Sequence, residues 1–288
     1  MKKSTLLHLR IPFSFFLLPV FLFAWAIAPQ VEASKFWIAF VVIHIFLYPA
    51  SNAYNSYFDK DEGSIGGLKK PPLVSQELYY YSILLDAIAV IVGWLAINWQ
   101  FGLMLFIAGW VSKAYSHPSV RLKKMAWLSW LTAGFFQGYF TFIMSYLALH
   151  DTTLSSTFTP FIQLPALLST AMLMGSYPMT QIYQHEEDSK RGDLTLSIKL
   201  GVLGTFHFTA LAFSISTAGF FLYFFHYFSW QTALIHVMCL TPVLLFFGYW
   251  YWKVRKDPSN ADFEHTMRLN LVSSIMLNLF FLSLGILL

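Results

Sequence analysis

The stretch Tyr48-Pro-Ala-Ser-Asn-Ala-Tyr-Asn-Ser-Tyr-Phe-Asp-Lys-Asp-Glu-Gly63 decides how the rest of the chain is interpreted. It places carboxamides and carboxylates at the end of a run of apolar residues that is long enough to cross a membrane. Asn55 and Asp59 follow Asn52 at the third and seventh positions, so a helix brings all three to one face. Polar side chains so close to lipid are costly and usually mark a functional site. We therefore expect a site at this end of the helix.

A second stretch, Tyr177-Pro-Met-Thr-Gln-Ile-Tyr-Gln-His-Glu-Glu-Asp-Ser-Lys-Arg-Gly192, repeats the pattern. Tyrosine, proline, tyrosine, aspartate and glycine recur at matching positions, and glutamines replace the asparagines of the first copy. So many chemically special residues in one register indicate an internal duplication. We predict a single domain over residues 1–288 that contains two repeat halves, about 11–125 and 126–256.

The composition is that of a membrane protein. Apolar residues make up 57% of the chain and charged residues only 11%, which excludes an ordinary soluble domain of this length. The net charge of +4 does not indicate nucleic-acid binding, because the basic residues follow the sides of the membrane. The single Cys239 excludes a disulfide framework and a thiolate metal site.

A membrane span needs about 20 residues, and nine apolar segments are close to this length. They run over residues 11–28, 36–57, 79–98, 101–116, 126–148, 161–183, 203–226, 231–252 and 269–288. With the N-terminus inside, every basic residue except Lys35 falls on the cytoplasmic side, as the positive-inside rule expects.

These segments predict an all-α protein integral to a bacterial plasma membrane. Its N-terminus and site loops would be cytoplasmic and its C-terminus outside. Two four-helix halves and a ninth helix would surround a central cavity. Both copies of the repeat fall at the inner end of an outside-to-inside helix, so the halves would share one orientation.

Acidic and amide side chains collect in the two site loops. Hard oxygen ligands of this kind suit Mg²⁺, which prefers to bridge carboxylates to the phosphates of a substrate. The candidate metal ligands are Asn55, Asp59, Asp61, Glu62, Gln184, Glu187 and Asp188. Asp59 and Asp188 occupy duplicated positions, and we predict that these two carboxylates are catalytic.

Basic residues lie in the same loops, and carboxylates together with cations are what a diphosphate with Mg²⁺ demands. The candidate diphosphate-binding residues are Asn55, Lys69, Lys70, Arg121, Lys123, Gln184, Lys190 and Arg191. A lipid tail attached to that diphosphate would lie among the aromatic helices. Each type of residue could also be present for a reason other than ligand binding. The cations could only set the membrane topology, and the loop acids could be solvated surface charges. The amides in the helices could cap them or form helix–helix hydrogen bonds.

The two motifs resemble those of the UbiA superfamily of intramembrane prenyltransferases. The family's first motif reads Asn-Asp-x-x-Asp-x-x-x-Asp, of which this chain keeps Asn55 and Asp59 but has Ser56 and Gly63 at the other acidic positions. The second motif reads Asp-x-x-x-Asp, followed by Gly and Thr-Leu. Here Gln184-His-Glu-Glu-Asp188-Ser-Lys-Arg-Gly192-Asp-Leu-Thr195-Leu keeps all but the first aspartate.

A third segment carries the same likeness. Tyr115-Ser-His-Pro-Ser-Val-Arg121-Leu-Lys123 is similar to the Tyr-Ser-x-Pro-Pro-x-Arg-Leu-Lys loop of members that act on chlorophyll-type or lipid acceptors. This likeness adds Tyr115 to the diphosphate-binding candidates. The resemblance covers nearly the whole chain.

The resemblance implies Mg²⁺-dependent transfer of a prenyl group from a polyprenyl diphosphate to a lipophilic acceptor, aromatic or lipid, within the membrane. Magnesium and the basic residues would stabilise the departing diphosphate. Aromatic faces would shelter the allyl cation and a dry cavity would keep water from it. The substitute ligands for the missing acids would be Asp61, Glu62, Glu186 and Glu187.

Two other classes of protein fit parts of the pattern. A non-catalytic lipid-binding or scaffolding member of the same fold would explain the missing acids. A transporter would explain the duplicated halves, but its charges should lie near the bilayer centre. Only Asp86 is a candidate for a deep charge.

Overall fold

The computed structural model describes residues 1–28, 30–150 and 152–287, and within these ranges the chain forms helices and no regular strand. The helices are α1 (Lys3–His8), α2 (Leu18–Ala26), α3 (Ala33–Val41), α4 (Tyr48–Asp59), α5 (Glu77–Ala96), α6 (Trp99–Ser116), α7 (Ala126–Phe135), α8 (Thr141–His150), α9 (Pro160–Ser176), α10 (His185–Lys190), α11 (Leu196–Tyr227), α12 (Trp230–Lys256) and α13 (Phe263–Leu287). Residue 288, the last of the expected ninth span, lies outside the described residues.

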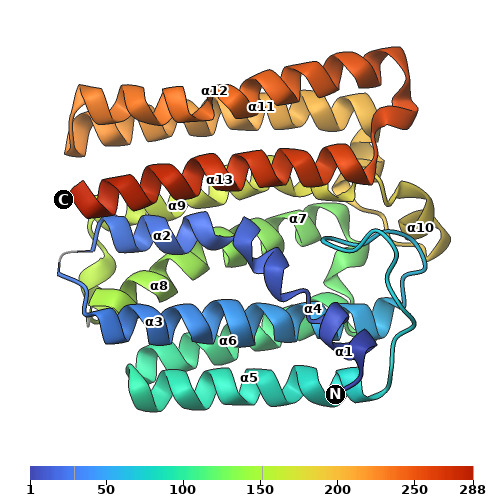
Figure 1. Ribbon diagram of the computed structural model, residues 1–288, viewed down its shortest axis with the longest axis horizontal. Coiled ribbons are helices and arrows are strands. Elements are labelled where there is room, and N and C mark those ends of the chain that lie inside the picture. The colour runs from blue at the N-terminus through green and yellow to red at the C-terminus, as the bar shows by residue number, and fades with distance from the viewer. Residues whose placement is uncertain (29, 151, 288) are drawn as a thin grey trace.

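The long helices lie side by side in one bundle (Figure 1). Helices α11, α12 and α13 pack in sequence, α13 lies against α2, and α4, α5 and α6 pack together on the other side. The N-terminus lies toward the end of the bundle that carries α10 and the C-terminus at the opposite end (Figure 1).

Length and hydropathy allow five helices of the described ranges to cross a membrane, or six if the bent pair formed by Lys3–Phe16 and α2 counts as one span. The chain is therefore an all-helical integral membrane protein. The number of nine spans and the equivalence of the two halves stay predictions, because several expected spans are broken into shorter helices.

The two Tyr-Pro pairs break their helices in different ways. Proline lacks the N–H that would bond to the preceding turn, and its ring crowds that turn. Before Pro49 the helix widens into a π-helical segment, Val42–Leu47, and then continues as α4, so that Ala33–Asp59 is one span. At Pro178 the helix ends instead, and a 3₁₀ segment, Tyr177–Gln181, leads to α10.

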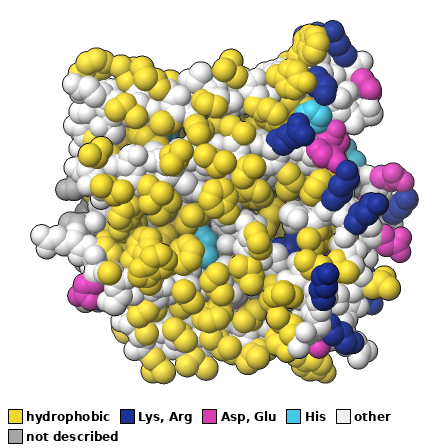
Figure 2. Space-filling view, viewed as in Figure 1, with side chains coloured by type: hydrophobic (Ala, Val, Ile, Leu, Met, Phe, Trp, Pro, Cys, Tyr) yellow, Lys and Arg dark blue, Asp and Glu magenta, His cyan; other side chains and the backbone are white. Residues whose placement is uncertain are grey.

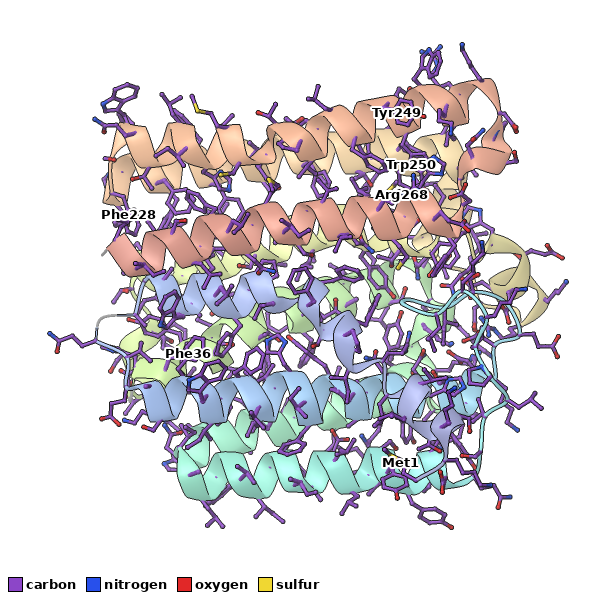
Figure 3. The ribbon with its side chains drawn as sticks, in the orientation of Figure 1. Met1, Phe36, Phe228, Tyr249, Trp250 and Arg268 are labelled. Carbon is purple, nitrogen blue, oxygen red and sulfur yellow. The ribbon has the colours of Figure 1, made fainter. Side chains whose placement is uncertain are left out.

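Aromatic side chains are prominent in the buried core. Apolar side chains cover the middle of the surface seen in Figure 2. In the core Phe23 stacks on Phe281 with ring centroids 4.5 Å apart. Lys, Arg, Asp and Glu gather at one end of the view in Figure 2, the end that carries α10. Trp250 and Arg268 lie toward this end, whereas Phe36 and Phe228 lie at the other (Figure 3).

Candidate active site

The two repeated stretches meet at the charged end of the bundle. Helix α4 ends at Asp59 because Lys60 adopts a left-handed conformation, with φ of 50°. The short helix α10 carries Asp188, and a turn then leads to Thr195, whose side chain caps the next helix by accepting a hydrogen bond from the N–H of Ile198. Between them lies a cavity of about 180 Å³, which we call the polar cavity.

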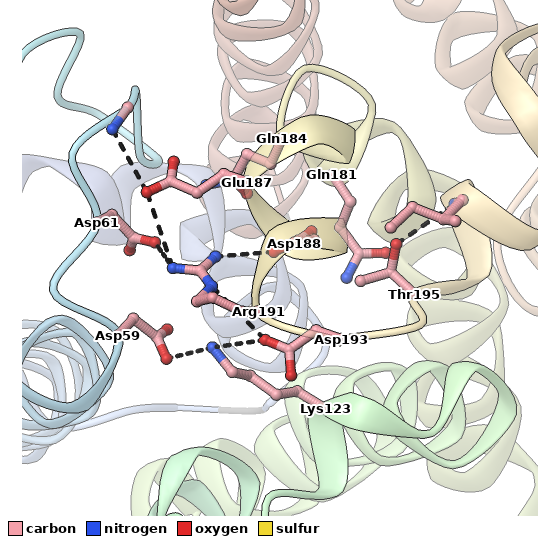
Figure 4. A network of polar contacts seen from close by, with 12 residues as sticks. Asp59, Asp61, Lys123, Gln181, Gln184, Glu187, Asp188, Arg191, Asp193 and Thr195 are labelled. Atoms are coloured by element: carbon pink, nitrogen blue, oxygen red, sulfur yellow. Dashed lines mark hydrogen bonds and ion pairs between the residues drawn. The ribbon is translucent and has the colours of Figure 1, made fainter.

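Arg191 lines the polar cavity and is the central side chain of the network of polar contacts shown in Figure 4. Its guanidinium pairs with Asp61 from the loop after α4, and it donates from Nη2 to Asp188 Oδ1 at 2.9 Å. Its Nε lies 3.7 Å from Asp193 Oδ2. One cation therefore joins carboxylates from both repeated stretches.

Two further cations come from the segment after α6. Arg121 binds Asp193 with two hydrogen bonds, from Nε at 2.9 Å and from Nη2 at 2.8 Å. Lys123 pairs with Asp59 and lies 3.7 Å from Asp193 Oδ2. All four side chains are at least 89% buried, so the charges are held away from water and depend on one another.

Glu187 and Gln184 tie the two site loops together. Glu187 Oε1 accepts hydrogen bonds from the backbone N–H of Glu62 at 2.9 Å and of Gly63 at 3.4 Å. Gln184 Nε2 donates to the carbonyl of Ser64 at 3.1 Å. A Cβ added to Gly63 would lie only 2.5 Å from Glu187 Oε2, so the glutamate occupies the space that a side chain at position 63 would need.

The polar cavity continues into a larger one of about 320 Å³, which we call the lipid cavity. Tyr115, Tyr177 and Asn55 line both cavities. The two tyrosine hydroxyls bond to each other, and Asn55 Nδ2 donates to Asp59 Oδ2 at 2.7 Å. Aromatic and aliphatic side chains such as Phe16 line the lipid cavity. A ligand with an anionic head in the polar cavity and an apolar tail in the lipid cavity fits this arrangement.

Burial and charge act against each other on the acids outside the helical spans. Burial raises the pKa of Asp188 to about 6, although Arg191 favours its ionised form. Burial would also raise the pKa of Asp193, but the hydrogen bonds from Arg121 and the nearby charge of Lys123 hold that pKa below its ordinary value. Of these two acids, Asp188 is the one with the raised pKa, so a further cation nearby would favour its ionised form.

The residues of the polar cavity provide oxygen ligands of the type that Mg²⁺ prefers. Gln181 lines the cavity, and its buried Oε1 accepts no hydrogen bond from the residues that the structure describes. The Asp59 and Asp188 carboxylates line the same cavity. Among the described ranges, no group of three or more His, Cys, Asp or Glu side chains is arranged to hold a metal by itself. Magnesium commonly uses one or two carboxylates together with substrate phosphates, so these residues fit an ion that binds along with a diphosphate.

The structure brings most of the predicted site residues together. The predicted residues that line the polar cavity are Asn55, Asp59, Asp61, Tyr115, Lys123, Gln184, Asp188 and Arg191. Arg121 joins them through Asp193, and Glu187 through the backbone of the loop after α4.

Four of the predicted residues lie apart from this cluster. Lys69 pairs with Glu264 and Lys190 with Glu186, all on the exposed surface. The side chains of Lys70 and Glu62 are also exposed and do not line the cavity. The deep charge Asp86 pairs with Lys113 on the neighbouring helix and lies outside both cavities.

Sequence reasoning missed several residues of the site. Arg10 lines both cavities, is 9% exposed, and donates to the carbonyls of Gly66 and Asn52 at 3.3 Å. In the sequence it is one more basic residue before an apolar run, and its left-handed φ of 47° has no sequence signal. Tyr177 belongs to the second repeated stretch, so its position alone could have identified it.

The fold and site define an all-helical membrane protein in which a cavity lined by paired charges adjoins a larger cavity. The sequence profile of the UbiA prenyltransferase family matches residues 16–272, and the chain belongs to this family. No functionally curated sequence matches significantly.

Solved structures of this family share the fold. A UbiA homologue from Archaeoglobus fulgidus, bound to GPP and Mg²⁺, is 16% identical with a TM-score of 0.68 over 98% of this chain and 99% of its own. A homologue from Aeropyrum pernix K1 without ligand is 17% identical with a TM-score of 0.70 over 96% and 97% of the chains. A digeranylgeranylglyceryl phosphate synthase is 17% identical with a TM-score of 0.63 and covers 99% of each chain.

Proposed function

We propose that this protein transfers a prenyl group from a polyprenyl diphosphate to a lipophilic acceptor, aromatic or lipid, in the membrane, with Mg²⁺ as cofactor. The observation that carries the proposal is the polar cavity, in which acids and cations from both repeated stretches meet and which opens into the lipid cavity. The family membership supports it, as do the homologues described as bound to GPP or DMAPP with Mg²⁺.

The cations of the network would hold the diphosphate. Arg191, Lys123 and Arg121 now neutralise carboxylates, and they would exchange these partners for phosphate oxygens. Arg10 would add a fixed positive charge at the boundary with the lipid cavity. When bound, Mg²⁺ supplies further positive charge to the diphosphate, and Asp59 and Asp188 are the carboxylates placed to hold it.

The reaction requires the allylic C–O bond to break, with its electron pair leaving on the diphosphate. The new bond then forms between the allylic carbon and the acceptor, which gives up a proton. Tyr115, Tyr177 and the aromatic rings beyond them would stabilise positive charge on the allyl group. The aromatic and aliphatic side chains in the lining of the lipid cavity, such as Phe16 and Phe136, would keep water from that carbon.

The glutamate from the second stretch would replace an acid missing from the first. The family motif has aspartate at the position of Gly63, and Glu187 reaches into that space. Its Oε1 holds the backbone of the loop while its carboxylate adds negative charge beside Asp61. We therefore assign Glu187 to the site in preference to Glu62 and Glu186, whose side chains are exposed.

We also propose that the charged end of the bundle faces the cytoplasm and that the membrane is a bacterial plasma membrane. The grouping of Lys and Arg at this end supports the orientation through the positive-inside rule. A soluble polyprenyl diphosphate head would then reach the polar cavity from the cytoplasm.

The direct test is turnover by the purified protein. Protein in detergent with Mg²⁺ is incubated with labelled polyprenyl diphosphates of several lengths and a mixed lipid extract, and the products are identified by mass spectrometry. Prenylated lipids made by the wild type and absent from a variant with Asp188→Ala would support the proposal. No product with any diphosphate, from protein that binds the same diphosphates, would contradict it.

A non-catalytic lipid-binding role is the second candidate. The absence of a preformed three-acid metal cluster from the described ranges favours it, as does the pairing of Asp59 and Asp61 with cations. This alternative predicts prenyl diphosphate binding that does not change with added Mg²⁺, whereas the proposed enzyme binds the diphosphate more tightly with Mg²⁺.

A further inference from the structure

The lipid cavity adjoins a third cavity of about 100 Å³ that the proposed chemistry does not use, and we call it the side chamber. It lies where α9, α11, α12 and α13 meet, with Pro19 of α2 at its edge. Phe16, Leu173, Ser176 and Asn270 line both the side chamber and the lipid cavity. The two spaces are therefore neighbours separated by shared side chains.

One buried histidine in the side chamber has no hydrogen-bond partner among the described residues. His236 is 1% exposed, and neither its Nδ1 nor its Nε2 bonds to any residue of the described ranges. A buried polar group without a partner costs free energy, and an imidazole carries two such atoms. Its ring is held by Phe220, Phe224 and Phe280, with centroids 5.0 to 5.2 Å away. The rings fix the imidazole in place but cannot satisfy its nitrogens.

The rest of the lining indicates what ligand would satisfy them. Hydroxyl-bearing residues of α9, α11 and α13 lie along the chamber, and the remaining lining is mostly aliphatic and aromatic. The hydroxyl-bearing residues are Ser176, Ser216, Thr217, Ser273 and Ser274. None of the described residues that line the chamber is Lys, Arg, Asp or Glu, so an ionic group would find no counter-charge there.

We propose that the side chamber binds the head of a neutral lipophilic alcohol or phenol, with His236 as its hydrogen-bonding partner. A neutral imidazole has one N–H donor and one acceptor nitrogen, and a hydroxyl group can likewise donate or accept. A hydroxyl group can therefore donate to one ring nitrogen or accept from the other. A ketone would accept only. The ligand is either the acceptor of the proposed transfer, reached through the lipid cavity, or a membrane lipid that stays in place.

The test measures binding without any prenyl diphosphate, so it does not depend on the proposed enzyme activity. The probes are 4-dodecylphenol and its methyl ether, 4-dodecylanisole, added to protein in detergent and followed by native mass spectrometry. The two probes share the tail, so their ratio cancels most of the partition into micelles. We expect the wild type to bind the phenol about tenfold more tightly than the ether.

The variant His236→Phe keeps the aromatic packing and removes both nitrogens, so we expect the two probes to bind equally. His44→Phe is the matched control, because His44 is also 1% exposed with an unpartnered Nε2 but lines none of the three cavities. If His236→Phe does not fold, Thr217→Trp narrows the chamber from α11 and should weaken both probes. A wild type without preference for the phenol, or a preference retained in His236→Phe, would overturn the proposal.

A second arm identifies the source of the ligand. If the acceptor occupies the chamber, 4-dodecylphenol should compete with turnover. If a membrane lipid occupies it, the protein as purified should carry a neutral lipid that the phenol displaces without inhibition. Either result supports the site, whereas a phenol that neither competes nor displaces any lipid contradicts it.

Discussion

Moving a carboxylate from position 187 in the second repeated stretch to position 63 in the first tests how the two stretches form one site. The change Gly63→Asp puts a Cβ 2.5 Å from Glu187 Oε2, so the glutamate has to withdraw. Its side-chain end is flexible, and the main cost is therefore the loss of its bonds to the loop backbone. The second variant, Glu187→Ala, loses the same bonds, and the double variant carries the acid on the other loop.

The magnitude follows from the hydrogen bonds. Bonds to a charged acceptor contribute ~1.5–3 kcal/mol each, but Glu187 is 24% exposed and the bond from Gly63 is long at 3.4 Å. After this discount we expect about 2 kcal/mol in total, which is about thirtyfold in an equilibrium constant. Each single variant should lose that factor in Mg²⁺-dependent affinity for a prenyl diphosphate. The double variant should recover most of it.

The assay is isothermal titration with a non-hydrolysable thio analogue of geranyl diphosphate, with and without Mg²⁺. Glu186→Ala is the matched control, because Glu186 is adjacent in sequence but exposed and bonded only to Lys190. It should bind like the wild type. Losses that multiply in the double variant, with no recovery, would refute the idea that Glu187 takes the place of an acid at position 63.

The remaining predictions concern the carboxylates and the orientation. Asp59→Ala and Asp188→Ala should each lower turnover by ~10-fold or more with near-normal expression, by analogy with losses at metal sites; wild-type rates at limiting Mg²⁺ would contradict this. Asp59→Asn combined with Lys123→Met should match the wild type in thermal stability, because removing both partners of a buried pair is often neutral, yet it should lose diphosphate-dependent stabilisation. Ser259→Cys should react with impermeant thiol reagents from the cytoplasmic side only, and labelling only from outside would reverse the proposed orientation.

The helical character and the position of the site could be predicted from the sequence, because both depend on local patterns. Apolar runs specify helices, and the repeated polar stretches at their ends specify where the site lies. The breaks within helices could not be predicted to the same degree. Tyr-Pro occurs in both copies, yet Pro49 is accommodated by a π-helical segment and Pro178 ends its helix. The two Tyr-Pro pairs are identical in sequence, so neither pair carries a signal for that difference.

The partners of each charge were the least predictable part of the site. All lysines near an apolar run look alike in the sequence, but Lys123 is buried against Asp59 whereas Lys69 and Lys190 point to solvent. Hydropathy and the positive-inside rule sort charges by side of the membrane and carry no information on depth. Arg10 shows the same limit, since only the fold brings the first helix against α4.

The paired charges support catalysis more than passive lipid binding. Burying ions has a desolvation cost that their mutual attraction often does not offset. A protein that only held a lipid tail would avoid this cost with an apolar interior. Here Asp59, Asp188, Lys123 and Arg191 gather at one mouth of the cavity, where each cation already bonds to an acid. A diphosphate can take over these cations, and the acids that are released need a new cation. Magnesium meets that need, so the binding of diphosphate and of metal should be mutually dependent.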